Sequence, residues 1–300
     1  MGYMGSFYKK LLDFIMLNFG ITIAGKDCNK NGGRKEVPMC AQLFLRMASV
    51  FLMPLILPLT AFAAPIVFSD FGPDAAAIQD GVDSFRAAVG NPNNGNTPGP
   101  LPTGRREINW DGGGAIIPTV SGTPLTAFLN TRGALFATPG TGFVQASPTD
   151  LGIQFSNPTY GTIFEAFSPQ RLFVPIGSNI TDTSFFIPGT NGGVAATTSA
   201  FGAVFSDVDF ANTASIQYFD VNGGSLGTFF ALPANEGLSF LGVQFTGGEL
   251  IGRVRITTGN SSLGPNDSGG VDVVVMDDFL YAEQRAVPEP SSIDCRSSSG

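Results

Sequence analysis

The sequence has no histidine in its 300 residues and only three cysteines, Cys28, Cys40 and Cys295. The missing imidazole removes the commonest general base and the commonest zinc ligand. The cysteines lie near the two ends of the chain, so the long stretch between Cys40 and Cys295 has no thiol and no internal disulfide. A histidine-activated nucleophile and a Cys/His zinc site are therefore both excluded.

Lysine is absent after Lys35, so arginine alone supplies positive charge in the rest of the chain. From Ala64 onwards there are nine arginines against 15 Asp and 6 Glu, a net charge of 9 − 21 = −12. An acidic chain repels phosphate backbones, and we therefore expect no nucleic-acid partner. The simplest reading of the acidity is that it keeps a phenylalanine-rich chain soluble.

One apolar run near the N-terminus is a candidate export signal. Residues 49–63, SVFLMPLILPLTAFA, are fewer than the roughly 20 apolar residues that a membrane span needs. Ala61 and Ala63 supply the small-x-small pattern of a signal-peptidase site. We predict a signal peptide over 47–64, cleaved after Ala63 or Ala64, and hence an exported protein.

Signal peptides begin near the first residue of a chain, whereas residues 1–46 precede this one. We interpret 1–46 as an extension that is not part of the folded protein, with translation starting at Met39 or Met47. The N-terminal sequence of the exported protein tests this hypothesis, because it should begin at Ala64 or Pro65.

Residues 65–285 predict one all-β domain. Short segments rich in Val, Ile, Phe and Thr alternate with Gly and Pro, as strands alternate with turns. About ten such segments favour a jelly-roll-like β-sandwich. Two glycine-containing turns predict hairpins. Asn222-Gly223-Gly224 would join 214–220 to 225–231, and Gly247-Gly248 would join 238–245 to 250–258.

One short N-terminal helix is expected within this domain, over 74–90. Its apolar residues recur every three or four positions: Ile78, Val82, Phe85 and Val89. Asp74 can cap the start of the helix and Gly90 can end it. Residues 91–104, rich in Asn, Pro and Gly, have the composition of an exposed loop.

The tail carries a recognisable motif, Val287-Pro288-Glu289-Pro290. It resembles the PEP-CTERM sorting signal of Gram-negative bacteria that make exopolysaccharide. Six further segments resemble a group of uncharacterised secreted PEP-CTERM proteins: DSFRAAVG (83–90), GRREINWDG (104–112), RGALFATPGTGF (132–143), FSPQRLF (167–173), FGAVFSDVDFAN (201–212) and VRITTGN (254–260). The resemblance implies a periplasmic, cell-surface or extracellular location and an exosortase as processing partner, and it implies no known activity.

The tail departs from the family after Ser292. The family has a transmembrane stretch and an arginine cluster there, whereas this chain has IDCRSSSG. Without about 20 apolar residues nothing can sit in a bilayer. We therefore expect 286–300 to be a remnant of the sorting signal, without a stable membrane anchor, and the product to be released.

Carboxylates offer two kinds of candidate site. Glu107, Asp111 and Glu165 could supply the acid and base of a glycan hydrolase, with Trp110 stacked on a sugar. The more ordinary interpretation is that such residues form structural ion pairs.

A structural calcium ion is the second carboxylate hypothesis, because calcium takes six to eight oxygen ligands. Secreted jelly rolls often place such an ion where the first and last strands meet, and Asp70 and the pair Asp277-Asp278 fall in those strands. Asp207 and Asp209, two residues apart on a strand, would point the same way.

Aromatic residues offer a third site. Trp110, Tyr160 and Tyr218 combine an apolar ring with a polar tip, as sugar-binding platforms do. Phenylalanine, with 27 residues, is far commoner and mainly predicts core. We expect an exported, non-catalytic protein of the cell envelope or extracellular matrix, associated with extracellular polysaccharide. A carbohydrate-binding module is the alternative and a glycan hydrolase a more distant one.

Overall fold

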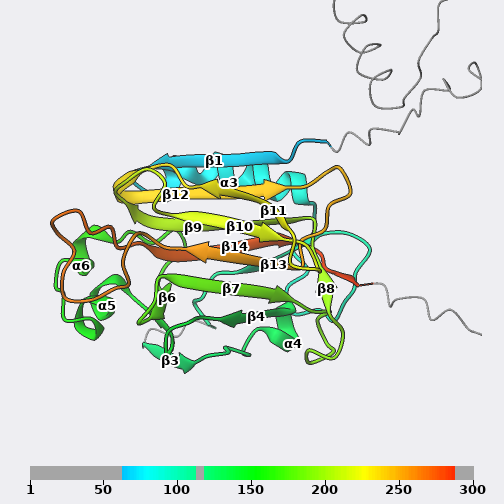
Figure 1. Cartoon of the computed structure of the whole chain (residues 1–300), viewed down its shortest axis with the longest axis horizontal. Coiled ribbons are helices and arrows are strands. Elements are labelled where there is room, and N and C mark those ends of the chain that lie inside the picture. Colours follow the sequence, from blue (N-terminus) through cyan, green and yellow to red (C-terminus); the bar gives the residue numbers. More distant parts are fainter. Residues whose placement is uncertain (1–62, 113–117, 288–300) are drawn as a thin grey trace, which may run out of the picture. The chain divides into compact units, whose positions relative to one another are not determined.

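Two antiparallel sheets lie face to face in the structure (Figure 1). The computed structural model describes residues 63–112 and 118–287. In chain order its elements are β1 (Ile66–Gly72), α3 (Ala75–Val89), β2 (Arg105–Ile108), β3 (Thr119–Gly122), α4 (Leu129–Arg132), β4 (Ala134–Ala137), β5 (Gly142–Ala146), α5 (Pro148–Gln154), α6 (Tyr160–Ile163), β6 (Leu172–Ile176), β7 (Ile180–Phe185), β8 (Ala196–Thr197), β9 (Ala200–Val208), β10 (Ser215–Phe219), β11 (Ser225–Phe230), β12 (Ala234–Gln244), β13 (Arg253–Thr257), β14 (Val275–Ala282) and β15 (Arg285–Ala286).

The strand order is that of a jelly roll. The large sheet has the order β1-β12-β9-β14-β6-β5-β3, with β2 also paired to β14, and the small sheet has the order β11-β10-β13-β7-β4. From β6 to β14 the chain crosses between the sheets at each step, except for the β10–β11 hairpin and the short β8. The segment β6-β14-β9-β12 therefore faces β7-β13-β10-β11, which is the pattern of interlocked Greek keys. The predicted all-β jelly-roll sandwich is confirmed.

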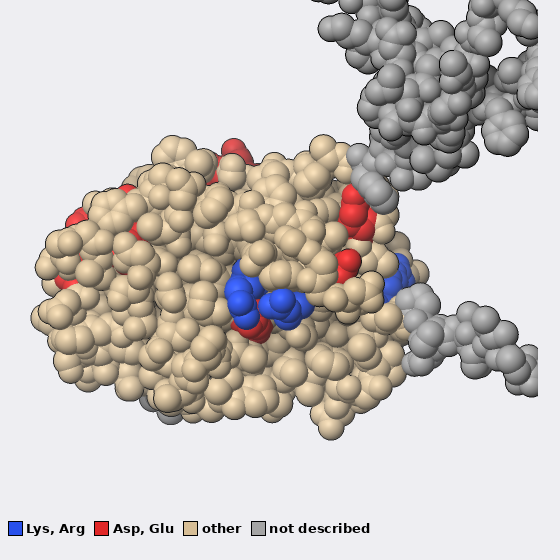
Figure 2. Space-filling view, in the orientation of Figure 1, with Lys and Arg blue, Asp and Glu red and all other residues tan. Residues whose placement is uncertain are grey.

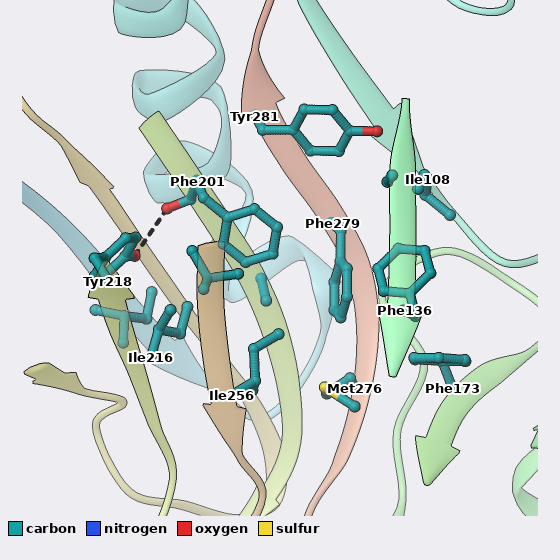
Figure 3. Packing of buried hydrophobic residues seen from close by; sticks show 14 of the residues in the cluster. Ile108, Phe136, Phe173, Phe201, Ile216, Tyr218, Ile256, Met276, Phe279 and Tyr281 are labelled. Carbon is teal, nitrogen blue, oxygen red and sulfur yellow. Dashed lines mark hydrogen bonds between the residues drawn. The ribbon is translucent and has the colours of Figure 1, made fainter. Parts of the chain in front are cut away.

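Eleven of the 28 buried residues in the core between the sheets are aromatic, and their rings pack among aliphatic side chains (Figure 3). Trp110 stacks on Phe173 with ring centroids 3.7 Å apart and meets Phe279 edge-on at 5.0 Å. Such pairs add to the free energy gained from removing apolar surface from water. Phenylalanine fills this core, as its abundance in the sequence predicts.

Helices cover the outer face of the large sheet in two places. Helix α3 has the predicted apolar stripe buried against the sheet, the Asp74 side chain accepts the N–H of Ala77, and Gly90 ends the helix with φ 102°. The short helices α5 and α6 cover β5 and β6 with a separate apolar cluster. They and α4 have only 4–7 residues and were not predicted, because one or two turns leave no periodicity to detect.

One predicted hairpin is confirmed and one is wrong. β10 and β11 pair across Asn222-Gly223-Gly224 as expected. Gly247-Gly248, however, does not join neighbouring strands, because β12 pairs with β1 and β9 whereas β13 pairs with β10 and β7. The two glycines lie on a crossover between sheets. A glycine pair marks a change of direction, but it does not say in which sheet the next strand lies.

The 91–104 segment has no helix or regular strand, as predicted, but part of it is buried rather than exposed. Asn94 donates from Nδ2 to Glu283 Oε2 at 2.8 Å, and the N–H of Leu101 donates to Glu283 Oε1 at 3.0 Å. Arg106 binds the same carboxylate with both Nε and Nη2, at 2.9 and 2.8 Å. Glu283 therefore ties this segment to the end of β14.

Candidate functional site

A break in the pairing of β14 places a group of polar side chains on the outer face of the large sheet. β14 pairs with β6 at Met276 and with β2 from Phe279 onwards, and its register with β9 shifts between these two residues. Met276 and Phe279 both belong to the core between the sheets. The extra residue of this bulge lets Asp277 and Asp278 both face the outer side.

We call the polar group at this bulge the carboxylate seam. It runs between the two apolar clusters on the outer face of the large sheet. Its members come from α3, the end of β2, the start of β6 and β14: Arg86, Glu107, Asp111, Ser168, Asp277 and Asp278. Three of the segments that carry the family resemblance, 83–90, 104–112 and 167–173, meet there.

Asp277 is fully buried at the centre of the seam. Its Oδ2 accepts the backbone N–H groups of Phe167 and Ser168 at 2.8 and 3.1 Å. Burial, and then the neighbouring charge of Asp278, raise the pKa of Asp277 well above its ordinary value. The raised pKa favours the protonated form of Asp277, and its Oδ2 holds the chain just before β6.

Asp278 lies between a hydroxyl and a cation. The Ser168 hydroxyl donates to its Oδ1 at 2.6 Å, and Arg86 Nη2 lies 3.8 Å from its Oδ2. The same Arg86 atom is 2.9 Å from Glu107 Oε2. Burial raises the pKa of Asp278 to about 6, against the lowering effect of the Ser168 hydrogen bond and of Arg86. Arg86 thus bridges two carboxylates that would otherwise repel each other.

Asp111 fastens the segment that leaves β2 to the segment that enters β6. Its Oδ1 accepts the N–H groups of Gln170 and Arg171 at 2.6 and 2.8 Å. Next to it, Trp110 has a φ of 64° and donates from Nε1 to the carbonyl of Asp277 at 3.1 Å. The seam therefore links β2 to β6, the two strands that both pair with β14.

The geometry of the seam suits fastening better than acid–base chemistry. The side chain of Asp278 is 5% exposed and that of Glu107 12% exposed. Each carboxylate of the seam accepts hydrogen bonds from the protein itself. A general acid or base needs a free path to its substrate, and these groups already have partners inside the fold. Glu165, the third carboxylate of the hydrolase hypothesis, is exposed and is not bonded to the seam.

A second acidic cluster lies where β9 ends. Asp207 has a φ of 65° and accepts the N–H of Glu236 at 2.8 Å. Burial raises the pKa of Asp207 to about 7, and the charges of Asp209 and Asp272 add to the effect. Asp272 is fully buried and accepts the N–H groups of Asp209 and Phe210 at 3.3 and 3.4 Å. Asp272 therefore holds the turn that follows β9.

The structure does not bring the predicted calcium ligands together, which is a correction. Asp70 lies on β1, and β12 and β9 separate that strand from β14 with Asp277 and Asp278. The first and last long strands therefore do not meet, because β1 joins the far edge of the sheet. Asp207 and Asp209 lie in the second cluster. Within residues 63–112 and 118–287, no three His, Cys, Asp or Glu side chains are placed to hold a metal ion.

The predicted sugar platform also needs correction. Trp110 is 1% exposed, and Tyr160 and Tyr218 are fully buried. Their polar tips bond to the interior: Tyr160 donates to the carbonyl of Gly264 at 2.7 Å and Tyr218 to that of Phe201 at 2.9 Å (Figure 3). The three rings are core residues, and none offers a face to a ligand.

No protein-family model, curated protein or solved structure matches the chain. None of the helices that the structure describes is long and apolar enough to cross a membrane.

The predicted processing sites lie at the limits of the described residues. Ala61, Pro288, Glu289 and Pro290 fall outside them. Ala63 and Ala64 are exposed and directly precede β1, so cleavage there would leave every described strand intact. At the other end, the N–H of Val287 donates to the carbonyl of Ala195 at 3.0 Å, which extends the pairing of β15 with β8.

Sequence reasoning missed Arg86 and Ser168. Ser168 meets Asp278 across 110 positions of sequence, and nothing local marks that contact. A usable signal did exist, since two adjacent aspartates inside an apolar strand cannot both alternate to one face. The pair Asp277-Asp278 indicates a bulge with polar partners.

Proposed function

We propose that this chain is an exported, non-catalytic protein of the cell envelope or extracellular matrix that associates with exopolysaccharide. One observation carries the proposal. Three of the segments that resemble secreted PEP-CTERM proteins supply partly buried polar residues to the carboxylate seam, where these bond to one another or to the buried Asp277 and Asp278: Arg86, Glu107, Asp111 and Ser168. Their role is to hold a sandwich together, as in proteins whose task is structural.

The two ends of the sequence support the location. The apolar run over 49–63 has the length and small-x-small ending of a signal peptide. The motif at 287–290 resembles a sorting signal of exopolysaccharide producers. We therefore propose that the protein functions in the periplasm, at the cell surface or in the extracellular matrix.

Fractionation of a Gram-negative exopolysaccharide producer tests the proposal. The full chain should be recovered from the periplasm, medium or washed-off matrix, with an N-terminus at Ala64 or Pro65. A variant with Leu55→Lys and Leu57→Lys, which breaks the apolar run, is the control and should stay in the cytosol. Recovery of the unaltered chain in the cytosol, beginning near Met1, would contradict the proposal.

The non-catalytic part needs its own test. Purified protein incubated with the host exopolysaccharide should leave its size distribution unchanged. Depolymerisation that is lost in Glu107→Gln but kept in Glu165→Gln would instead make the seam an active site. Loss in both variants would point to the hydrolase pair considered from the sequence.

A further inference from the structure

The outer face of the small sheet is open, unlike that of the large sheet. In Figure 1 this sheet lies in front, with no described helix over it, and Figure 2 shows the same face as mostly uncharged. A group of basic and acidic atoms lies near its centre, over β13 and β7. It consists of Arg253, Arg255 and Asp182, which we call the arginine pair and its aspartate.

The register places these three side chains side by side. Asp182 lies opposite Arg255. Its Oδ1 accepts from Arg253 Nη1 at 2.7 Å and from Arg255 Nε at 2.9 Å, and its Oδ2 accepts from Arg255 Nη2 at 2.7 Å. Two cations thus share one anion, so the group has a net charge of +1.

Several arginine N–H groups remain for another acceptor. A guanidinium has five N–H donors, and the bonds to Asp182 use one of those of Arg253 and two of those of Arg255. The side chains are 32% and 42% exposed, so the remaining donors reach the surface. Arg253 lies over the ring of Phe219, 3.9 Å from its centroid, which fixes the guanidinium before any ligand arrives.

This local charge is opposite to that of the molecule. The described residues contain 8 Arg against 14 Asp and 5 Glu, a net charge of 8 − 19 = −11. Duplex nucleic acid, with one charge per about 1.7 Å of helix axis, is strongly repelled by that field. A polysaccharide with one carboxylate per sugar unit has a lower charge density and can place one carboxylate on the arginine pair. Charge complementarity therefore favours such a polysaccharide over a nucleic acid.

The surroundings of the arginine pair suit sugars. Gln217 lies opposite Arg255 on β10, and Thr228 lies opposite Gln217 on β11. A hollow of about 500 Å³ adjoins Arg253, and its lining combines the polar residues Ser184 and Asn222 with apolar residues such as Phe186 and Val221. Its volume is in the roughly 300–1,000 Å³ range of ligand pockets. Asp220 also lines it, and its Oδ1 is held by the N–H groups of Asn222 and Gly224.

We infer that the open face of the small sheet binds a uronate-bearing polysaccharide. A sugar carboxylate takes the remaining N–H groups of Arg253 and Arg255, and neighbouring sugar units lie along the sheet and in the hollow. The inference rests on the proposed function, to which it adds a substrate class and a surface. It also moves the predicted carbohydrate site away from Trp110, Tyr160 and Tyr218.

Binding of the full exported chain to immobilised polygalacturonate tests this, with neutral dextran as the reference polymer. We expect binding to polygalacturonate that weakens with salt, and none to dextran. The double variant Arg253→Gln/Arg255→Gln should bind at least about 10-fold more weakly, as the loss of one charge-assisted contact predicts. Arg285→Gln, which changes an exposed arginine outside the small sheet, is the matched control and should bind like the unaltered chain.

Asp182→Asn gives the sharper readout. Loss of the internal counter-ion should raise the affinity for polygalacturonate several-fold, a direction that damage to the fold would not produce. Thermal unfolding of each variant shows whether it is folded, and Arg255→Lys keeps the charge while removing the planar fork, so it should have intermediate affinity.

Three results would overturn the inference. They are equal binding by the double variant and the unaltered chain, weaker binding by Asp182→Asn, and tighter binding to single-stranded DNA than to polygalacturonate. Failure here is distinguishable from failure of the proposed function. If the protein is exported but does not bind polygalacturonate, only the inference is wrong. If it stays in the cytosol and binds polygalacturonate, only the proposed function is wrong.

Discussion

The outer faces of the two sheets both carry ion pairs between arginine and carboxylate side chains, but these pairs differ in how much water reaches them. On the large sheet, Arg86 joins Glu107 and Asp278 beneath α3, where little of these side chains reaches water. On the small sheet, Asp182 joins Arg253 and Arg255, whose side chains are 32% and 42% exposed to solvent. Burial decides the difference, because a covered ion pair cannot be removed without leaving an unpaired charge, whereas an exposed one exchanges its partners with water.

The largest effect is expected from the apolar contacts that cover the large sheet. Phe85→Ala on α3 removes edge-on contacts with Phe68 and Phe240, at 5.4 and 5.5 Å, and should lower the free energy of unfolding by about 3–5 kcal/mol. Phe219→Ala on the open face should cost less than about 1 kcal/mol, because that ring is only partly buried. Urea unfolding of both variants measures this difference in the free energy of unfolding, and equal losses in the two variants would contradict it.

Loss of a carboxylate should likewise lower the free energy of unfolding more on the large sheet than on the small sheet. Asp277→Ala leaves the N–H groups of Phe167 and Ser168 without an acceptor and should cost about 3 kcal/mol. Asp182→Ala should cost about 1 kcal/mol or less, as for exposed ion pairs. Asp277→Asn keeps an acceptor oxygen and no charge, so we expect it to recover most of the loss in the same urea assay. An Asn variant as damaged as the Ala variant would show that Asp277 is charged in the fold.

The pH dependence of stability separates covered from open carboxylates. Burial raises the pKa of Asp207 to about 7 and that of Asp278 to about 6, from a usual value of 3.8. A raised folded-state pKa means that the folded protein binds more protons than the unfolded chain. The stability that these two groups contribute is therefore fully present below about pH 4 and is lost as pH rises to about 6–7. We expect a loss of about 4 kcal/mol from these groups between about pH 5 and about pH 8, from about two pK units for Asp207 and about one for Asp278.

Asparagine substitutions show which aspartates cause the loss of stability with rising pH. Asp207→Asn and Asp278→Asn should each flatten the profile measured by thermal unfolding. Stability that rises from acid to neutral pH in the unaltered chain would contradict the raised pKa values.

The smallest effect is expected from the arginines of the open face. Arg255→Gln should lower the free energy of unfolding by less than about 1 kcal/mol, and added salt should erase the difference. Arg86→Gln leaves Glu107 and Asp278 close together under α3 and should cost about 2 kcal/mol, largely independent of salt. Chemical unfolding at low and high salt compares the two variants. An equal salt dependence would contradict the difference between the covered and the exposed ion pairs.

Local patterns in the sequence predicted the local parts of this fold. The apolar repeat of α3 and the Asn222-Gly223 turn each depend on residues a few positions apart, and both predictions hold. The destination of the strand after Gly247-Gly248 depends on contacts with distant strands, and that prediction failed. Turn chemistry specifies a bend, while the pairing partner is set by packing of the whole sandwich.

The site was less predictable than the fold. Residue type alone does not tell whether Trp110 is a sugar platform or a core ring, because the same side chain serves both. The partners of Asp277 and Asp278 come from segments more than 100 positions earlier in the chain. In β13, Arg253 and Arg255 alternate with the buried Val254, and this period-two pattern places both arginines on the surface proposed for binding.

The position of β14 has a consequence for biogenesis. This strand lies in the middle of the large sheet, between β9 and the pair β6 and β2, and the ribosome makes it after all three. Until residues 275–282 emerge, the sheet has an open slot at its centre and the sandwich cannot close. Closure through such distant pairings is slow. Under the export proposed above, this delay would give a translocation channel that accepts only unfolded chains time to engage the chain.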